Sequence, residues 1–187
     1  MEFCSSIGIE CVGIAPPGPY HELEKIWRKR LEQGHFTGFE EMDVSKRIDP
    51  RLTLEDARSV IVCLFPYFTG HTSGANLSKS AFSIDYHIIV KNKLEQIGFF
   101  LSSHINNFKY KAFVDNGPLA DRYMAYLAGL GYFGINGHII TDKYGSYVFI
   151  GYIINNYPFP QDEPLDKTCI RCGHCVKKCP GYAILGN

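Results

Sequence analysis

Residues 59–68 read SVIVCLFPYF, a short and continuous apolar run that is rich in β-branched side chains. Such a run predicts a strand that is buried on both faces of a sheet. The apolar runs at residues 10–15 and 110–114 end in turn-forming residues and predict two more strands. Residues 138–141 and 147–155 are also strand-like, and the intervening sequence KYGS predicts that they form a hairpin.

Between these strands, apolar side chains recur at helical spacing in three segments. We expect helices around residues 23–31, 84–101 and 119–130, with glycines at or after their ends. Residues 35–50 are polar, interrupted by glycines and poorly periodic, which predicts mainly loop. The resulting order of strand, helix, strand, helix, strand, helix and hairpin predicts an α+β fold with α/β-like alternation.

Charge and hydropathy exclude several classes of protein. The chain has 187 residues, and its 19 Lys and Arg residues balance its 19 Asp and Glu residues. No overall basic field therefore indicates nucleic acid as a partner. No apolar run reaches the roughly 18 residues needed to span a bilayer. Because the first residues also lack a basic signal region, we expect a cytoplasmic protein without membrane association.

The cysteines carry the strongest chemical signal. Four of the seven lie close together near the C-terminus: Cys169, Cys172, Cys175 and Cys179. With Pro180 after the last, the spacing is that of one half of a bacterial two-cluster ferredoxin motif, in which three thiolates surround one iron–sulfur cube and the fourth serves the other cluster. Zinc is the alternative, because His174 lies inside the run, although structural zinc usually takes two more widely separated ligand pairs.

The remaining thiols do not complete a second cluster. Cys4, Cys11 and Cys63 are isolated in sequence, and we expect them to be buried and unreactive. The ligand set is therefore incomplete, and we expect either that the chain is part of a longer protein or that a partner supplies the missing thiolates. The Pro-rich acidic stretch 158–166 predicts a linker between a domain at 1–157 and an incomplete [4Fe-4S] ferredoxin-type segment at 167–187.

Several short motifs occur in the order in which they occur in one known family. They are ECVGIA at 10–15, RIDPR at 47–51, ARSVIV at 57–62, DYH at 85–87, AFVD at 112–115, GLGYFGIN at 129–136, YGS at 144–146, and the cysteine run followed by AI at 183–184. On these residues the chain resembles the epoxyqueuosine reductases, cobalamin- and iron–sulfur-dependent enzymes of queuosine-tRNA maturation. The resemblance covers nearly the whole chain and the N-terminal half to two-thirds of a typical member.

This resemblance implies a cobalamin-binding domain related to the nitroreductase-like α+β class, followed by the first half of a two-cluster ferredoxin module. Cobalamin would lie base-off between the two modules. A low-potential donor would supply electrons through the [4Fe-4S] clusters to cobalt, and the epoxide of a modified base in tRNA would be reduced. Because the cluster ligands are incomplete, we expect the isolated 187-residue chain not to turn over.

The resemblance also implies roles for individual residues. Asp115 corresponds to the general acid proposed for the family. The implied cofactor-binding residues are Met42, Asp115, Asn136, Gly137 and Ser146. An acid makes chemical sense, because the alkoxide formed on opening an epoxide leaves poorly unless it is protonated. The alternative for Asp115 is ordinary turn chemistry in the sequence DNGP. We expect His87, which follows Asp85 and Tyr86, to be a partly buried residue at a capped helix start.

The glycines of GLGYFGING permit close approach to a flat ligand, or else form a helix C-cap and a turn. Two other functions remain open. One is a reductive-dehalogenase-like corrinoid iron–sulfur protein, which would act on a carbon–halogen bond. The other is a non-catalytic electron-transfer or iron–sulfur subunit whose cysteine set is completed by another chain.

Overall fold

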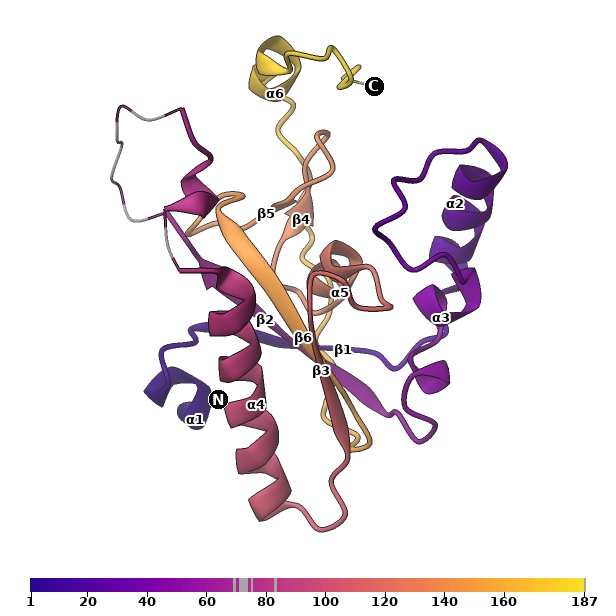
Figure 1. Ribbon diagram of the computed structural model, residues 1–187, viewed down its shortest axis with the longest axis vertical. Helices are drawn as coiled ribbons and strands as arrows, with labels where there is room; N and C mark the ends of the chain where they lie inside the picture. Colours follow the sequence, from indigo (N-terminus) through magenta and orange to yellow (C-terminus); the bar gives the residue numbers. More distant parts are fainter. Residues whose placement is uncertain (69, 71–73, 75, 83, 187) are drawn as a thin grey trace.

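A four-stranded antiparallel sheet forms the centre of the computed structural model, which describes residues 1–68, 70, 74, 76–82 and 84–186 (Figure 1). The strand order is β1-β2-β6-β3. The strands are β1 (Cys11–Ala15), β2 (Ser59–Pro66), β3 (Tyr110–Val114) and β6 (Val148–Asn155). The α+β fold class predicted from the sequence is confirmed.

The apolar run that predicts a doubly buried strand is β2, and the prediction is confirmed. Val60, Val62 and Leu64 pack into one hydrophobic cluster, while Ile61 and Cys63 pack into the cluster on the opposite face. Successive side chains of a strand point to opposite faces, so a sheet covered on both sides selects apolar residues at every position. Here that pattern occurs in an antiparallel sheet that has helices on both faces.

One face of the sheet is covered by α1 (Glu2–Ser6) and the long helix α4 (Tyr86–His104) (Figure 1). The approach of α4 to the sheet is close because β6 has a glycine beneath it. A Cβ atom on Gly151 would lie 2.7 Å from Cγ1 of Val90 and 2.9 Å from Cδ1 of Leu94. A larger residue at this position would push the helix off the sheet.

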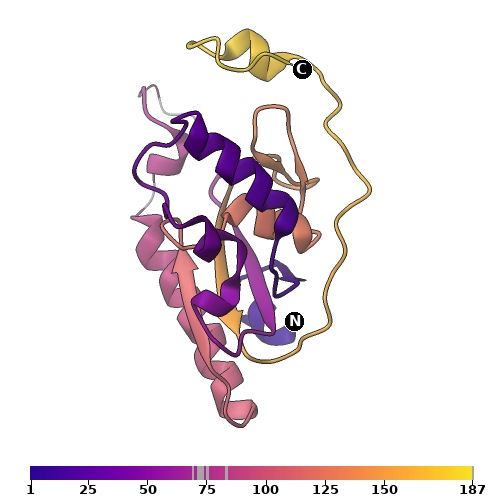
Figure 2. The same ribbon diagram turned by 90° about the vertical axis from the view of Figure 1, so that its right-hand side faces the viewer.

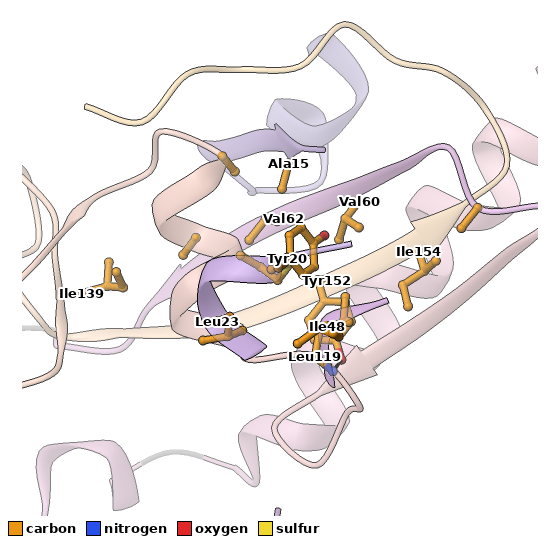
Figure 3. Packing of buried hydrophobic residues seen from close by; sticks show 14 of the residues in the cluster. Ala15, Tyr20, Leu23, Ile48, Val60, Val62, Leu119, Ile139, Tyr152 and Ile154 are labelled. Carbon is orange, nitrogen blue, oxygen red and sulfur yellow. Dashed lines mark hydrogen bonds between the residues drawn. The ribbon is translucent and has the colours of Figure 1, made fainter. Parts of the chain in front are cut away.

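The other face is covered by α2 (His21–Glu32), α3 (Val44–Ile48) and α5 (Asp121–Leu127). Figure 3 shows the core between these helices and the sheet, with Tyr152 at its centre. Tyr152 and Leu119 are almost completely buried there. A Cβ on Gly13 would lie 2.3 Å from the carbonyl oxygen of Ala128, so the end of α5 rests directly on β1.

Residues 35–50 are mainly loop, as the sequence predicts, but they also contain α3, which Asp43 caps by accepting a hydrogen bond from the Ser45 amide at 2.9 Å. One turn of helix is too short to show periodicity. The predicted hairpin does not form: β5 (Ile139–Ile140) pairs with β4 (Tyr132–Phe133) in a separate two-stranded sheet, whereas β6 pairs with β2 and β3.

Residues 156–173 form an extended segment, the C-terminal strap, that runs along the outside of the molecule to α6 (His174–Lys178) (Figure 2). Asp162 fixes the strap to the outer edge of β1. Its amide donates to the Ile14 carbonyl at 2.9 Å, and its Oδ2 accepts from the Ile14 amide at 2.8 Å. The strap thus covers a sheet edge that would otherwise expose unpaired backbone groups. The linker and domain boundaries assigned to this region stay predictions.

Two short 3-10 helices, Pro50–Leu52 and Lys79–Ala81, complete the secondary structure of the described residues. Within that part of the chain, no helix combines the length and the apolar character needed to cross a membrane.

Candidate functional site

A strained corner follows β3 and presents Asp115. The backbone of Asp115 has a φ of +61°, in the left-handed region that residues with a Cβ rarely adopt. Two hydrogen bonds hold the corner: the Gly117 amide donates to the Asp115 carbonyl at 2.8 Å, and the Leu119 amide donates to the buried Tyr152 hydroxyl at 3.0 Å. The sequence DNGP therefore forms a turn, and the same turn exposes the carboxylate of Asp115.

The side chain of Asp115 meets the first turn of α4. The Tyr86 hydroxyl donates to Asp115 Oδ2 at 2.9 Å, and His87 Nε2 lies 3.4 Å from the same oxygen. Asp85 is the N-cap of α4 and lies on the other side of the imidazole, with Oδ1 at 2.7 Å from His87 Nδ1. Burial and the hydrogen bond to Asp115 raise the pKa of Tyr86, so this phenol stays protonated at neutral pH.

Two cavities meet at this corner. The larger has a volume of about 820 Å³ and lies between α2 and the segment from the corner into α5, while the smaller has a volume of about 220 Å³ and reaches toward β6. Asp115, Asp121 and Arg122 line both. These three side chains therefore form the wall that the two cavities share.

Three buried polar atoms in the larger cavity have no hydrogen-bond partner within the described chain: Trp27 Nε1, Arg47 Nε and Asp121 Oδ1. The Arg47 guanidinium lies over the Trp27 ring, 3.9 Å from its centroid. Buried polar groups in folded proteins are nearly always hydrogen-bonded. Three exceptions in one cavity indicate a place where a polar ligand, or ordered water, supplies the missing partners.

The electrostatics of the wall are unusual. Burial, and secondly the charge of Asp115, raise the pKa of Asp121 to about 8. Burial also lowers the pKa of the Arg47 guanidinium, an effect that Asp121 partly offsets. His138 lines the smaller cavity, and burial followed by the nearby charge of Arg122 lowers its pKa. The site therefore contains an acid that is protonated at neutral pH and an imidazole that is neutral.

The residues implied as cofactor ligands are only partly gathered here. Asp115 and Gly137 line the larger cavity, and Asp115 and Ser146 line the smaller one. Asn136 lines neither cavity; its Oδ1 accepts from the His138 amide at 3.2 Å and shapes the turn between β4 and β5. Met42 also lines neither, and it is exposed on the loop before α3.

The glycines of residues 129–137 serve the packing of the chain. Gly129 has a φ of +65° after the end of α5, and a Cβ there would lie 2.6 Å from the Glu163 carbonyl oxygen of the strap. A Cβ on Gly131 would lie 2.6 Å from Ile139. At these two positions the glycines form a helix C-cap and a turn, as the second interpretation predicts. The close approach that they permit is between two segments of the chain.

The four clustered cysteines lie on the strap and around α6. Within the described residues, no three His, Cys, Asp or Glu side chains come together as a metal site. The surroundings of Cys179 nevertheless suit a thiolate: the Ala183 amide donates to Sγ at 3.3 Å, and this bond with those of the neighbouring amides lowers the pKa of the thiol. Burial instead raises the pKa of Cys4 and Cys63, as expected for unreactive thiols.

Comparison with known proteins shows which proteins the chain is similar to. The family described as Epoxyqueuosine reductase QueG, DUF1730 matches residues 47–116, from the buried arginine to the corner after β3. An epoxyqueuosine reductase of Bacillus anthracis is 33% identical over 195 residues, covering 99% of this chain and 51% of the relative. The chain is similar to the epoxyqueuosine reductases over nearly its whole length.

Solved structures of epoxyqueuosine reductases share the fold. One, in complex with an epoxyqueuosine-modified tRNA-Tyr stem loop, has a TM-score of 0.90 at 32% identity over 98% of this chain and 51% of that one. Another, from Bacillus subtilis with its catalytic aspartate loop swung out of the active site, has a TM-score of 0.87 at 30% identity, covering 98% and 51% of the two chains. The chain thus spans about half the length of the epoxyqueuosine reductases it matches.

A catabolic reductive dehalogenase is more distant, with a TM-score of 0.67 at 13% identity, covering 96% of this chain and 24% of that one. This likeness shows a shared fold only. It does not favour the dehalogenase function that was left open by the sequence.

Sequence reasoning missed three residues of the cavity: Trp27, Arg47 and Asp121. Trp27 is one of the apolar positions of an amphipathic helix, and Arg47 stands in the RIDPR motif without any sign that it is buried. The only local signal for Asp121 is an acidic residue at the start of a helix, which usually reflects the helix dipole. Its Oδ1 is buried by residues that lie far from Asp121 in the sequence.

Proposed function

We propose that this protein acts in the reduction of epoxyqueuosine to queuosine in tRNA, with cobalamin bound at the two cavities and Asp115 as the proton donor. The observation that carries the proposal is the placement of Asp115. It is a carboxylic side chain on a left-handed corner, hydrogen-bonded by Tyr86, on the wall shared by both cavities.

The chemistry requires such a group. The overall change converts an epoxide, two electrons and two protons into an alkene and water. The oxygen leaves only when it is protonated as its bonds to carbon break, so an acid must lie beside it. Side-chain hydrogen bonds from α4 orient the Asp115 carboxyl, and the rigid corner fixes its backbone.

The larger cavity fits a ligand with many amide groups. A corrin ring carries carboxamide side chains, which supply both acceptors and donors for the unpartnered atoms of Trp27, Arg47 and Asp121. Gly137 and Ser146, with Asp115, are the proposed cofactor residues that line the cavities. When bound, cobalamin supplies the reducing electrons to the substrate.

The cysteine segment is proposed to hold the iron–sulfur ligands. Its donor chemistry fits, because the amides around Cys179 stabilise a thiolate, as hydrogen bonds to sulfur do at such clusters. A low-potential donor would supply the electrons. As a tRNA-modifying enzyme the protein would work in the cytoplasm. A relative bound to an epoxyqueuosine-modified tRNA stem loop supports tRNA as the substrate carrier.

Cofactor binding is tested first, on the chain itself. Purified anaerobically, it is titrated with cob(II)alamin, and the visible spectrum and electron paramagnetic resonance report the base-off state. We expect saturable base-off binding. Arg47→Gln is expected to weaken it about tenfold or more, because this substitution removes a guanidinium from the cavity wall. Absence of binding, together with uptake of one tetrahedral zinc by the cysteines, would overturn the proposal.

The acid is tested in an enzyme that holds both cofactors and the missing cluster thiolates, because the isolated chain is not expected to turn over. Asp115→Asn is expected to lower the single-turnover rate on an epoxyqueuosine hairpin by about 10²–10⁴-fold, the usual contribution of a general acid. Asp56→Asn is the matched control, because Asp56 is a half-buried aspartate that pairs with Lys109 and lines neither cavity. An Asp115→Asn enzyme as fast as the control would show that Asp115 is not the acid.

A further inference from the structure

A chain of three polar side chains leads from the proposed acid, Asp115, along the first turn of α4. Asp85 Oδ1 lies 2.7 Å from His87 Nδ1, and His87 Nε2 lies 3.4 Å from Asp115 Oδ2. The second distance is long for a strong hydrogen bond, and a small movement of either side chain closes it. In enzymes without substrate such contacts are often long and tighten in the complex.

His87 and Asp115 face different spaces. His87 lines a hollow of about 430 Å³ beside α4 and β3, and Asp115 is not among the residues that line it. Asp115 lines the two cavities of the proposed site, and His87 lines neither. His87 therefore links Asp115 to water in the hollow by a route that does not pass through the two cavities.

The imidazole is held in place. Its ring stacks on Tyr86 with 4.0 Å between centroids, and Tyr86 stacks in turn on Phe149 at 3.9 Å. The Asp85 carboxylate fixes which nitrogen faces it, and it also accepts the His87 amide at 2.9 Å as the cap of α4. The side chain of His87 is 44% exposed, so it exchanges protons with solvent.

The reaction itself requires a supply of protons to Asp115. Each reduction consumes two protons, and a single carboxyl group holds one. If Asp115 gives both, it must take up a new proton during every turnover. Meanwhile the bound ligands exclude water from the side of its carboxyl group that faces the cavities. A positioned imidazole is the side chain best suited to this near neutral pH.

We propose that His87, held by Asp85, is a proton relay that reloads Asp115 from solvent. The proposal rests on the proposed function of Asp115. In each reloading step the proton on His87 Nε2 passes to Asp115 Oδ2, which leaves a neutral imidazole whose Nδ1–H remains bonded to Asp85. Nε2 then takes a proton from water in the hollow, and no electrons are exchanged.

The charges around His87 favour the protonated imidazole from which the relay starts. The hydrogen bond to Asp85 is the main cause that raises the pKa of His87, with the hydrogen bond to Asp115 adding to it. The other groups facing it are Tyr86, which stays protonated, and Lys91, which lines the hollow and is paired with Glu95 at 3.0 Å. Asp121 lies beyond Asp115 on the cavity wall.

The relay is tested with two substitutions. His87→Gln removes the titrating group, and Asp85→Asn keeps a good helix cap but removes the charge that holds the imidazole. His104→Gln, at the opposite end of α4, is the matched control. In the assembled enzyme we expect His87→Gln to lower the single-turnover rate at least tenfold and to abolish the loss of rate at high pH that the wild type shows. Asp85→Asn is expected to move that loss of rate to lower pH.

A second measurement does not depend on activity. Titration of the His87 ring by proton–carbon NMR should give a pKa above the ordinary value for histidine in the wild-type chain, and a lower one in Asp85→Asn. An unshifted wild-type pKa would overturn the relay. So would a His87→Gln enzyme with wild-type rate and pH profile while Asp115→Asn is inactive. If Asp115→Asn were fully active, the proposed function itself would fail instead.

Discussion

Replacing Tyr152 with phenylalanine tests how the corner that carries Asp115 is held. Tyr152 is fully buried, and its hydroxyl accepts the hydrogen bond of the Leu119 amide at 3.0 Å. Phenylalanine retains the ring, which stacks on Phe113 at 5.3 Å, but removes the acceptor. The Leu119 N–H is then left buried without a partner, a situation that costs about 1–3 kcal/mol.

The expected loss of unfolding free energy is therefore about 1–3 kcal/mol. For a chain of this size each kcal/mol lowers Tm by about 2–4 °C. We would measure it by urea unfolding at pH 7, where the midpoint should fall while the slope m stays constant. Amide exchange at Leu119 should also become faster, since that N–H has lost its bond.

Tyr110→Phe is the matched control. The Tyr110 hydroxyl is also hydrogen-bonded, but as a donor: it donates at 2.9 Å to Glu95, whose side chain is 46% exposed. Water replaces the lost partner there, so the change should stay below about 0.5 kcal/mol. If Tyr152→Phe lost no more stability than Tyr110→Phe, the reasoning that the buried hydroxyl holds the corner would be refuted.

Two further predictions concern the wall of the cavity and the strap. Asp121 has a folded pKa of about 8 against an ordinary 3.8, so the folded state keeps a proton that the unfolded state has lost. Its contribution to stability is therefore full below pH 4 and is lost as pH rises toward about 8. Asp121→Asn should remove this part of the pH dependence in urea unfolding at pH 5 and pH 9, and an unchanged difference between the two pH values would contradict it. Asp162→Ala should cost about 1 kcal/mol and speed amide exchange at Ile14, whose N–H loses its acceptor; unchanged exchange would show that the strap is held elsewhere.

The motifs that carry the resemblance occur in order along the chain, and the likeness to epoxyqueuosine reductases extends over 99% of it. The cofactors and the role of Asp115 are proposals that the cavity geometry supports, and tRNA is a proposal that the stem-loop complex of a relative supports. The reductive dehalogenases share the fold, which supports a common architecture and not a common substrate.

What the sequence by itself determined is local. The β-branched run of β2 specifies a strand buried on both faces, and the spacing of apolar residues in α4 specifies a helix with one buried stripe. The cysteine spacing indicates a cluster motif, because three thiolates with two residues between neighbours can surround one iron–sulfur cube. Each of these signals depends only on neighbours in the chain.

Only the tertiary structure decided which strands pair and which polar groups meet. β5 and β6 follow each other in sequence, yet β6 pairs between β2 and β3, because its apolar residues are buried on both faces there. The contact between His87 and Asp115 and the burial of Asp121 Oδ1 likewise join separate segments. Hydrophobic periodicity states that a residue is buried but not against what, so a site assembled across elements is defined only when the elements pack.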